Sequence, residues 1–186
     1  MAIIHIEDGE PLPELGFPGI ILVNPKFSAN VVNVHRLAAC FGAPQVWCTG
    51  NRVAQDMGHR RKTRLPPEER MRGFGRVDLV WCDRAVEVFA SAGARVVGVE
   101  IADGAKSLLE FAHRAADHGD RIVYVFGPED GKLQEPTAAL CDVIVEIPAF
   151  HSLNLATAVS TVMWDRTYKL WRDQGVPPPE PSDTTA

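Results

Sequence analysis

Short apolar runs alternate with helical patterns along the chain, and this alternation constrains the fold more than any other feature. The runs are rich in β-branched residues and are bounded by turn residues. They are GIILVN (19–24), PQVWCT (44–49), VDLVWC (77–82), ARVVGVE (94–100), RIVYVF (121–126) and DVIVEI (142–147). Nearly continuous apolar runs of this length are typical of strands that are buried on both faces.

The stretches between these runs have helical patterns. We expect helices over 31–41, 84–93, 105–119 and 152–171, with a short turn at 136–140. Gly93 and Gly119 stand where two of these helices would end, which is common helix-stop chemistry. Strands that alternate with helices predict an α/β fold with a mainly parallel sheet and helices on both faces. We expect a single domain over 1–174 and a disordered, proline-rich tail over 175–186.

The composition narrows the functional classes. None of the 186 residues belongs to an apolar stretch of the roughly 18–20 residues that a membrane helix needs. The amino-terminal residues have no cationic patch before an apolar run, so we expect no secretory signal and a cytoplasmic protein without a membrane partner. The four cysteines lack metal-ligand spacing, which favours reduced, buried thiols and no metal.

A basic segment interrupts an otherwise acidic chain. Residues 52–76 hold eight Lys or Arg against three acids, although the net charge of the chain is −5. The densest part is HRRKTR, which contributes Arg60, Arg61, Lys62 and Arg64. Such a patch can hold the phosphates of a polyanion, and a solvated loop is the alternative.

The stretch VFGPEDGKL (125–133) closes one apolar run with an unusual set of residues. It is not a phosphate-binding Walker loop, because three residues separate Gly127 from Gly131 and Leu133 stands where a hydroxyl is needed. Nor does the chain contain the glycine fingerprint of a dinucleotide-binding fold. The carboxylates that follow Gly127 could line a ligand site at the sheet edge, or the segment could be a plain turn.

Three segments become informative when they are considered together. Residues 24–42 contain NP, then Asn30 and Arg36, then Phe41-Gly42; residues 125–133 contain Phe126, Gly127 and Glu129; residues 147–159 contain Ile147-Pro148 and Ser152-Leu153-Asn154. In order and spacing they resemble the three motifs of the SpoU (TrmH-like) branch of the SPOUT superfamily of RNA ribose 2′-O-methyltransferases.

The resemblance implies a fold that composition would not suggest. It implies a carboxy-terminal trefoil knot whose loops hold S-adenosylmethionine, and a homodimer that completes the RNA-binding surface. The last predicted helix would supply much of that interface through its apolar stripe, which consists of Leu155, Val159, Val162 and Met163. No metal is required, because the leaving thioether is neutral.

The resemblance also assigns roles to individual residues. The catalytic set that it implies is Asn30, Arg36, Glu129, Ser152 and Asn154. The residues implied to hold the cofactor, mostly through main chain, are Val99, Phe126, Gly127, Ile147, Pro148 and Leu153. Arg36 would stabilise the developing alkoxide of the ribose, because a guanidinium does not normally deprotonate. Glu129 would orient Arg36 or Asn30.

The chain departs from the family pattern in three ways. Val32 replaces a family glycine, the Gly-Leu pair is displaced to Gly131-Lys132-Leu133, and no separate RNA-binding domain precedes the motifs. The short architecture resembles the branch that methylates the wobble ribose of tRNA. We therefore expect a tRNA ribose 2′-O-methyltransferase. The alternatives are an rRNA enzyme, a non-catalytic RNA-binding relative in which Val32 blocks the pocket, and an unrelated α/β enzyme for small molecules.

Overall fold

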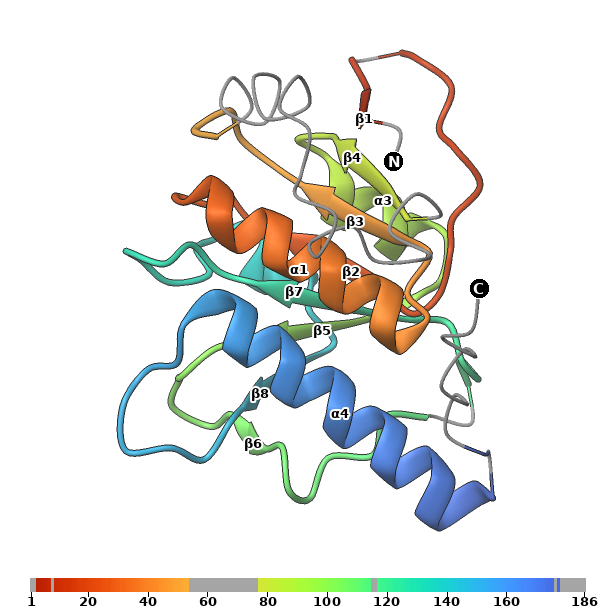
Figure 1. Cartoon of the computed structure of the whole chain (residues 1–186), viewed down its shortest axis with the longest axis vertical. Helices are drawn as coiled ribbons and strands as arrows, with labels where there is room; N and C mark the ends of the chain where they lie inside the picture. Colours follow the sequence, from red (N-terminus) through yellow and green to blue (C-terminus); the bar gives the residue numbers. More distant parts are fainter. Residues whose placement is uncertain (1–2, 8, 54–76, 115–116, 176, 178–186) are drawn as a thin grey trace, which may run out of the picture.

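A parallel β-sheet forms the centre of the molecule (Figure 1). The structure is a computed structural model, and it describes residues 3–7, 9–53, 77–114, 117–175 and 177. Eight strands are present in this part of the chain, in the order β1-β4-β3-β2-β7-β5-β8-β6, and every pairing is parallel. The strands are β1 (Ile3–His5), β2 (Gly19–Leu22), β3 (Gln45–Cys48), β4 (Asp78–Trp81), β5 (Arg95–Val99), β6 (Lys106–Ser107), β7 (Ile122–Phe126) and β8 (Val143–Glu146).

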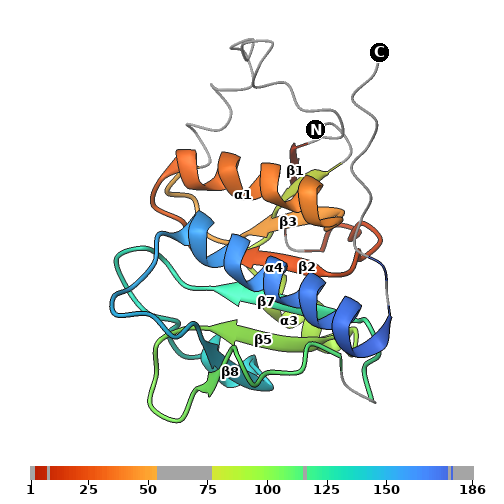
Figure 2. The ribbon, with the colours of Figure 1, turned by 60° about the horizontal axis from the view of Figure 1, so that its bottom comes forward.

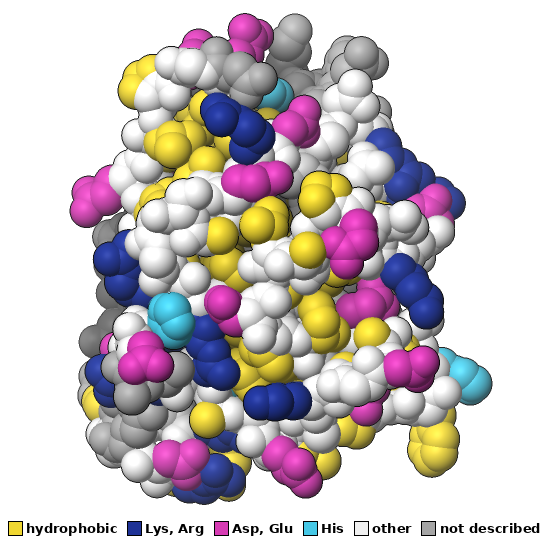
Figure 3. All heavy atoms as spheres, turned by 180° about the vertical axis from the view of Figure 1, so that it is seen from behind, with side chains coloured by type: hydrophobic (Ala, Val, Ile, Leu, Met, Phe, Trp, Pro, Cys, Tyr) yellow, Lys and Arg dark blue, Asp and Glu magenta, His cyan; other side chains and the backbone are white. Residues whose placement is uncertain are grey.

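Helices cover both faces of the sheet. The helices α1 (Ser28–Phe41) and α4 (Leu155–Gln174) pack against each other on one face, across the strands (Figure 2). The shorter helix α3 (Ala85–Ser91) and the 3₁₀ turn η3 (Ala138–Leu140) lie together on the other face, where charged side chains of both signs are interspersed (Figure 3). The alternation of elements follows from the sequence pattern, and the predicted α/β class is confirmed. The predicted knot in the backbone stays a prediction.

All six predicted strands are present. They form the centre of the sheet, where side chains are buried on both faces as the continuous apolar runs indicated. Two edge strands were not predicted, because β1 has only three residues and β6 only two. Runs this short carry too little periodicity to be recognised as strands.

The helix expected over 105–119 is not formed. Its first residues make β6, and the following residues to Arg114 run without helical structure. Leu108 and Phe111 are buried as an i, i+3 pair would be, but their carbonyls accept hydrogen bonds from Lys169 of α4. Tertiary hydrogen bonds therefore replace the helical ladder that the local pattern favoured.

The apolar stripe of α4 has a different role from the one expected. Its members Leu155, Val159, Val162 and Met163 are buried in the core of the same protomer, so they are not available for a dimer interface. The exposed apolar side chains of α4 are aromatic, namely Trp164, Tyr168 and Trp171. An amphipathic helix buries its stripe against its own sheet first, and the expectation of an interface was wrong for these four residues.

Several smaller observations concern the tryptophans, the cysteines and the described ranges as a whole. Trp47 and Trp81 are buried, as their places in strands indicated. No disulfide joins the four cysteines, but Cys40 is exposed rather than buried. Within the described ranges, no helix is long and apolar enough to cross a membrane, and no group of three or more His, Cys, Asp or Glu could hold a metal ion. Arg60, Arg61, Lys62 and Arg64 lie outside the described residues.

Candidate active site

The segments that follow the neighbouring strands β2 and β7 leave the sheet toward opposite faces. These strands are neighbours, and Leu22 lies opposite Phe126 at their carboxyl ends. The segment after β2 enters α1 on one face of the sheet, whereas the segment after β7 leads to η3 on the other face. In open α/β sheets such a divergence opens a crevice at the strand ends, and this is where ligands bind.

Glu129 lies in this crevice and closes the amino-terminal end of α1. Its carboxylate accepts hydrogen bonds from the backbone N–H groups of Lys26 at 2.7 Å and Phe27 at 3.4 Å. Phe27 is the N-cap residue of α1 and its own side chain makes no capping hydrogen bond. A carboxylate at this position satisfies orphan donors and complements the helix dipole, so Glu129 supplies a cap that the local sequence lacks.

Two asparagines extend this contact to the third motif. The side-chain amide of Asn30 donates to Glu129 Oε1 at 2.9 Å, and its carbonyl oxygen accepts from the amide of Asn154 at 3.1 Å. Asn154 is the N-cap of α4, where its Oδ1 accepts from the backbone N–H of Ala156 at 2.9 Å. A single chain of hydrogen bonds, which we call the motif network (Glu129, Asn30 and Asn154), therefore joins all three motif segments.

A cleft of about 430 Å³ lies beside the motif network. It is bounded by the segments that follow β5, β7 and β8, which come together at one edge of the sheet (Figure 1). The described residues that line it are Phe27, Asn30, Val99, Glu100, Ile101, Phe126, Gly127, Pro128, Glu129, Gly131, Ile147, His151, Ser152, Leu153, Asn154, Leu155 and Ala158. Its size is in the range of small-molecule and cofactor sites.

The backbone at Gly127 makes a close approach inside this cleft. A Cβ at this position would come within 3.1 Å of Glu100 Oε2 and 3.2 Å of the backbone nitrogen of Leu133. The same Glu100 oxygen accepts a hydrogen bond from the Leu133 N–H at 3.0 Å. A side chain at Gly127 would push these groups apart, so glycine keeps the strand end narrow and its backbone open to a ligand.

Most of the predicted site residues line this cleft. Of the predicted catalytic set, Asn30, Glu129, Ser152 and Asn154 do so, and of the predicted cofactor set all but Pro148 do so. Arg36 lies on α1 six residues beyond Asn30, is exposed and does not line the cleft. Val32 also stays outside the cleft and packs against the core, so its side chain does not block the pocket.

The two histidines that flank the motifs lie in different surroundings. His35 is completely buried, and its Nε2 lies 2.8 Å from the carbonyl oxygen of Val77. Burial lowers the pKa of His35, which favours the neutral ring. This contact is structural, and His35 does not line the cleft. His151, in contrast, is exposed and lines the cleft.

Sequence reasoning missed Phe27, Glu100 and Ile101 as lining residues. Glu100 and Ile101 directly follow the last residue of β5, so the rule that ligands bind beyond strand ends could have found them. Phe27 has no comparable signal. It is 52% exposed, and only the position of α1 relative to β7 brings it to the cleft.

A charged cluster borders the cleft on the side of β2 and β3. Asp130 forms an ion pair with Lys26 at 3.2 Å and a bidentate pair with Arg52 at 2.9 and 2.8 Å. Hydrogen bonds from Arg52 and Lys26 lower the pKa of Asp130 well below its usual range. The three residues follow three different strands, so the cluster also ties their loops together.

Known proteins share this architecture. The chain is 27% identical over 158 residues to the tRNA (cytidine-2′-O-)-methyltransferase TrmJ of Methanocaldococcus jannaschii, and the match covers 78% of this chain but only 65% of that relative. A solved structure described as giving insights into the 2-OH methylation of C/U34 on tRNA is 27% identical, with a TM-score of 0.59 over 84% of this chain and 97% of that one.

A further solved structure shares the fold. The SpoU methyltransferase AviRb of Streptomyces viridochromogenes, in complex with AdoMet, has a TM-score of 0.58 and 20% identity over 81% of this chain and 59% of that one. Residues 19–164 match the sequence model of the SpoU rRNA Methylase family. That range contains the motif network and almost all of the residues around the cleft. The three motif segments meet in one cleft, and the parallel sheet is shared with these relatives. The chain belongs to the SpoU rRNA Methylase family.

Proposed function

We propose that the protein transfers a methyl group from S-adenosylmethionine to a ribose 2′-hydroxyl of tRNA. The motif network is the observation that carries this proposal, because it joins Asn30, Glu129 and Asn154 at the edge of a cleft of cofactor size. Membership of the methylase family supports the reaction class. The tRNA substrate is supported by the activity named for the archaeal relative and by the tRNA subject of the 27% identical structure.

The cleft suits a sulfonium nucleoside in shape and chemistry. Val99, Gly127 and Ile147, at or just beyond the ends of β5, β7 and β8, line the cleft and would hold the donor mostly through their main chain. Phe126 and Leu153 add apolar surface for a purine ring. The shared fold includes a relative solved with AdoMet, which supports the same donor here. The donor supplies an electrophilic methyl carbon attached to a positive sulfur.

Residues of this chain then have to position the acceptor ribose and stabilise its 2′-oxygen as the proton leaves. A bond forms between the ribose oxygen and the methyl carbon while the carbon–sulfur bond breaks, and the hydroxyl proton leaves to solvent or to an RNA phosphate. Asn30 and Ser152 stand at the cleft to hold the ribose, with Asn30 fixed by Glu129 and Asn154. Positioning of this kind contributes several kcal/mol to a transfer between two bound groups.

Arg36 acts at the acceptor oxygen in the assembled, RNA-bound state. Because it is exposed and outside the cleft of its own protomer, the proposal requires a second copy or the bound RNA to bring it there. We assign the dimer contact to the exposed aromatic side chains of α4, Trp164, Tyr168 and Trp171. The basic residues Arg60, Arg61, Lys62 and Arg64 then hold tRNA phosphates, in the cytoplasm.

Two measurements test the proposal. Isothermal titration calorimetry should show saturable binding of S-adenosylmethionine, and radiolabelled donor should transfer methyl to tRNA but not to a 2′-deoxy version of the same site. Arg36→Ala should lower transfer about 100-fold and leave donor binding unchanged, because it removes charge stabilisation of the transition state only. Arg114→Ala, a change of another exposed arginine far along the chain, is the matched control.

Mixing experiments separate the two ways in which Arg36 could reach the site. If Arg36 acts on a neighbouring copy, a mixture of Arg36→Ala and Glu129→Ala protomers should recover part of the wild-type activity. No recovery would place Arg36 and Glu129 in one protomer's site. Absence of donor binding by the wild-type protein would instead favour a non-catalytic RNA-binding relative.

A further inference from the structure

A second cavity lies on the same edge of the sheet as the cleft. It has a volume of about 390 Å³ and lies at the carboxyl ends of β1, β3 and β4. The residues that line it are His5, Ile6, Glu7, Gly50, Asn51, Trp81, Cys82 and Asp83. All strands of the sheet are parallel, so this cavity and the cleft open on one continuous edge.

The first three lining residues belong to this chain rather than to the family pattern. His5, Ile6 and Glu7 precede residue 19, where the match to the family begins. They are carried by β1, which pairs with β4 in parallel and places His5 opposite Trp81. Strand β1, which lies outside the range that matches the family, therefore builds one wall of a cavity on the same sheet edge as the cleft.

The chemistry of the cavity suits a nucleobase. The His5 ring is exposed and stacks on the indole of Trp81, with ring centroids 5.6 Å apart and planes 18° from parallel. The indole is fixed in turn, because its N–H donates to the carbonyl of Gly50 at 2.9 Å. Trp81 is 6% exposed, so it supports the His5 ring from below, and the exposed face of His5 is the surface on which a base would stack.

The polar groups around the rings favour a base over a phosphate. Glu7 and Asp83 bring two carboxylates to the cavity, and Asn51 brings an amide. Carboxylates repel phosphate but accept hydrogen bonds from exocyclic amino groups, such as that of cytosine. Asp83 is held in place because its Oδ1 accepts from the Gly50 N–H at 2.7 Å.

A charged cluster of Lys26, Arg52 and Asp130 lies between the two cavities, where the RNA backbone would run from one to the other. Lys26 follows β2 and Arg52 follows β3, and these strands lie between β7 and β4. At about 4.8 Å per strand, the cleft and the second cavity are about 15–25 Å apart. A few nucleotides of single-stranded RNA cover this distance, and their phosphates would pass the cluster of Lys26, Arg52 and Asp130, in which two cations share one carboxylate.

We propose that the second cavity is a subsite for a base with an exocyclic amino group, a few nucleotides from the methylated ribose. This inference rests on the proposed function, because it takes RNA as the substrate. It assigns β1 and the His5–Trp81 pair to substrate selection. The cluster of Lys26, Arg52 and Asp130, which carries one excess positive charge, then lies on the path of the RNA between the two cavities.

Nuclear magnetic resonance tests the subsite without any need for catalysis. The Trp81 indole N–H signal, assigned by its absence in Trp81→Phe, should move on addition of cytidine, adenosine or guanosine 5′-monophosphate and move least with uridine 5′-monophosphate. The shifts should be lost in His5→Ala. No shift with any of the four nucleotides, or equal shifts in His5→Ala, would overturn the subsite.

Kinetics supply the second test. His5→Ala should raise the KM for tRNA about tenfold, the loss of one stacked base, while kcat and the affinity for S-adenosylmethionine stay unchanged. Asp83→Asn should narrow the difference between the Trp81 signal shifts caused by nucleotides with an exocyclic amino group and the shift caused by uridine 5′-monophosphate. The matched control is Asp120→Asn, which lies before β7 at the opposite edge of the sheet. An unchanged KM in His5→Ala refutes the subsite and leaves the methyltransferase intact, whereas wild-type protein without transfer refutes the proposed function alone.

Discussion

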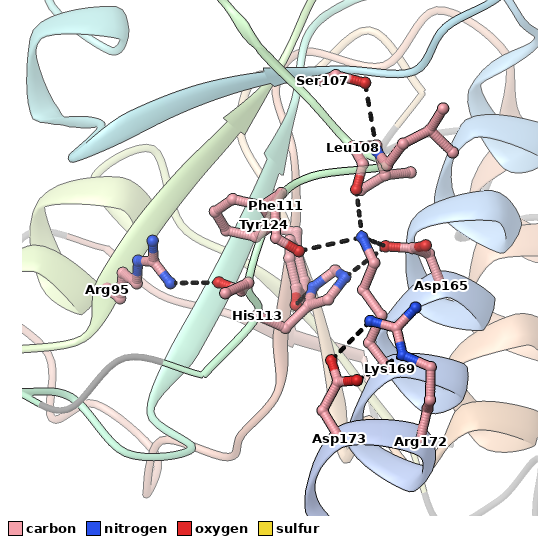
Figure 4. A network of polar contacts seen from close by, with 12 residues as sticks. Arg95, Ser107, Leu108, Phe111, His113, Tyr124, Asp165, Lys169, Arg172 and Asp173 are labelled. Carbon is pink, nitrogen blue, oxygen red and sulfur yellow. Dashed lines mark hydrogen bonds and ion pairs between the residues drawn. The ribbon is translucent and has the colours of Figure 1, made fainter.

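Two polar networks hold α4 in place, and they differ in what surrounds them. The motif network meets the start of the helix at Asn154 and lies beside an open cleft. The second network, which we call the buried network, meets the second half of the helix and consists of His113, Tyr124, Asp165 and Lys169 (Figure 4). One network faces a ligand site, and the other faces the interior.

Each member of the buried network has at least one hydrogen-bond or ion-pair partner within it. Asp165 pairs with Lys169 at 2.8 Å and lies 2.7 Å from His113 Nε2, while His113 Nδ1 lies 2.6 Å from the hydroxyl of Tyr124. Lys169 also donates to the carbonyls of Leu108 and Phe111. Because Lys169 already neutralises Asp165, a neutral His113 that donates to Asp165 and accepts from Tyr124 satisfies every group.

The difference shows how one helix can serve both fold and function. Buried charges are costly to leave unpaired, so the buried network has little freedom and fixes α4 against the strap of residues 108–113. In the motif network Asn30 is buried, but Glu129 is partly exposed and Asn154 is exposed at the cleft, where water can replace a lost partner. A ligand can therefore change the motif network without unfolding the helix, and the following changes test that contrast.

The largest expected effect is on the buried network. Asp165→Asn leaves the ammonium of Lys169 without its counter-ion in a site where that side chain is 8% exposed. We expect the free energy of unfolding to fall by about 3 kcal/mol, measured by urea denaturation. A double-mutant cycle with Lys169→Met gives the coupling energy of the pair.

A matched surface pair provides the control for this change. Arg114 and Asp120 form an ion pair at 3.2 Å, but their side chains are 44% and 56% exposed. Asp120→Asn should cost less than about 1 kcal/mol, since exposed ion pairs contribute little. Equal losses at Asp165 and Asp120 would contradict the assignment of α4 docking to the buried network.

The next effect concerns activity rather than stability. Glu129→Ala frees the amide of Asn30 and removes the cap of α1, so Asn30, to which we assign the positioning of the ribose, loses its orientation. We expect methyl transfer to tRNA to fall about 100-fold, with a modest loss of stability. Glu87→Gln on α3, on the opposite face of the sheet, should retain full activity.

The sequence predicted the two networks unequally. Asn30, Glu129 and Asn154 stand in motifs at strand ends, so their meeting at the cleft could be expected before the structure was known. The buried network could not, because residues 105–119 have a helical pattern and the strap that replaces the helix is fixed by contacts with α4 that lie more than fifty residues away. Local propensity cannot report such distant partners.

Two further limits have the same origin. The apolar stripe of α4 was assigned to a dimer interface, whereas the position of the sheet places it in the core of the protomer. Strand β1 has three residues, and its partner β4 begins seventy-five positions after it. Pattern therefore identified the central elements and the strand-end chemistry, whereas edges and long-range polar contacts required coordinates.

Acid should weaken the buried network through His113. Burial lowers the pKa of His113 to about 4, against 6.5 for an exposed histidine. The unfolded chain therefore binds a proton between pH 6.5 and 4 that the native protein does not, so this contribution to stability falls as the pH drops through that window. We expect a loss on the order of 2 kcal/mol in urea denaturation between pH 7 and pH 4.5.

A comparison of histidine variants isolates this contribution. His113→Gln should flatten the pH dependence, although some slope will remain because burial also lowers the pKa of His35. His118→Gln, a change at a partly buried ring outside the buried network, is the matched control. A slope that survives intact in His113→Gln would mean that His113 binds protons equally in the native and unfolded states, which contradicts its burial as the cause.

The smallest expected change is at Asn154, where the motif network and the cap of α4 share one side chain. Asn154→Ala removes the acceptor for Ala156 and Thr157 and the donor to Asn30, which should cost about 1 kcal/mol of stability. Asn154→Ser keeps a capping oxygen, so its stability should return to that of the wild type. Both variants lose the bond to Asn30, so methyl transfer should be low in each. If the serine variant regains full activity, the bond from Asn154 to Asn30 serves the fold alone. The motif network would then be structural at this residue, as the buried network is, and the contrast between the two networks would fail.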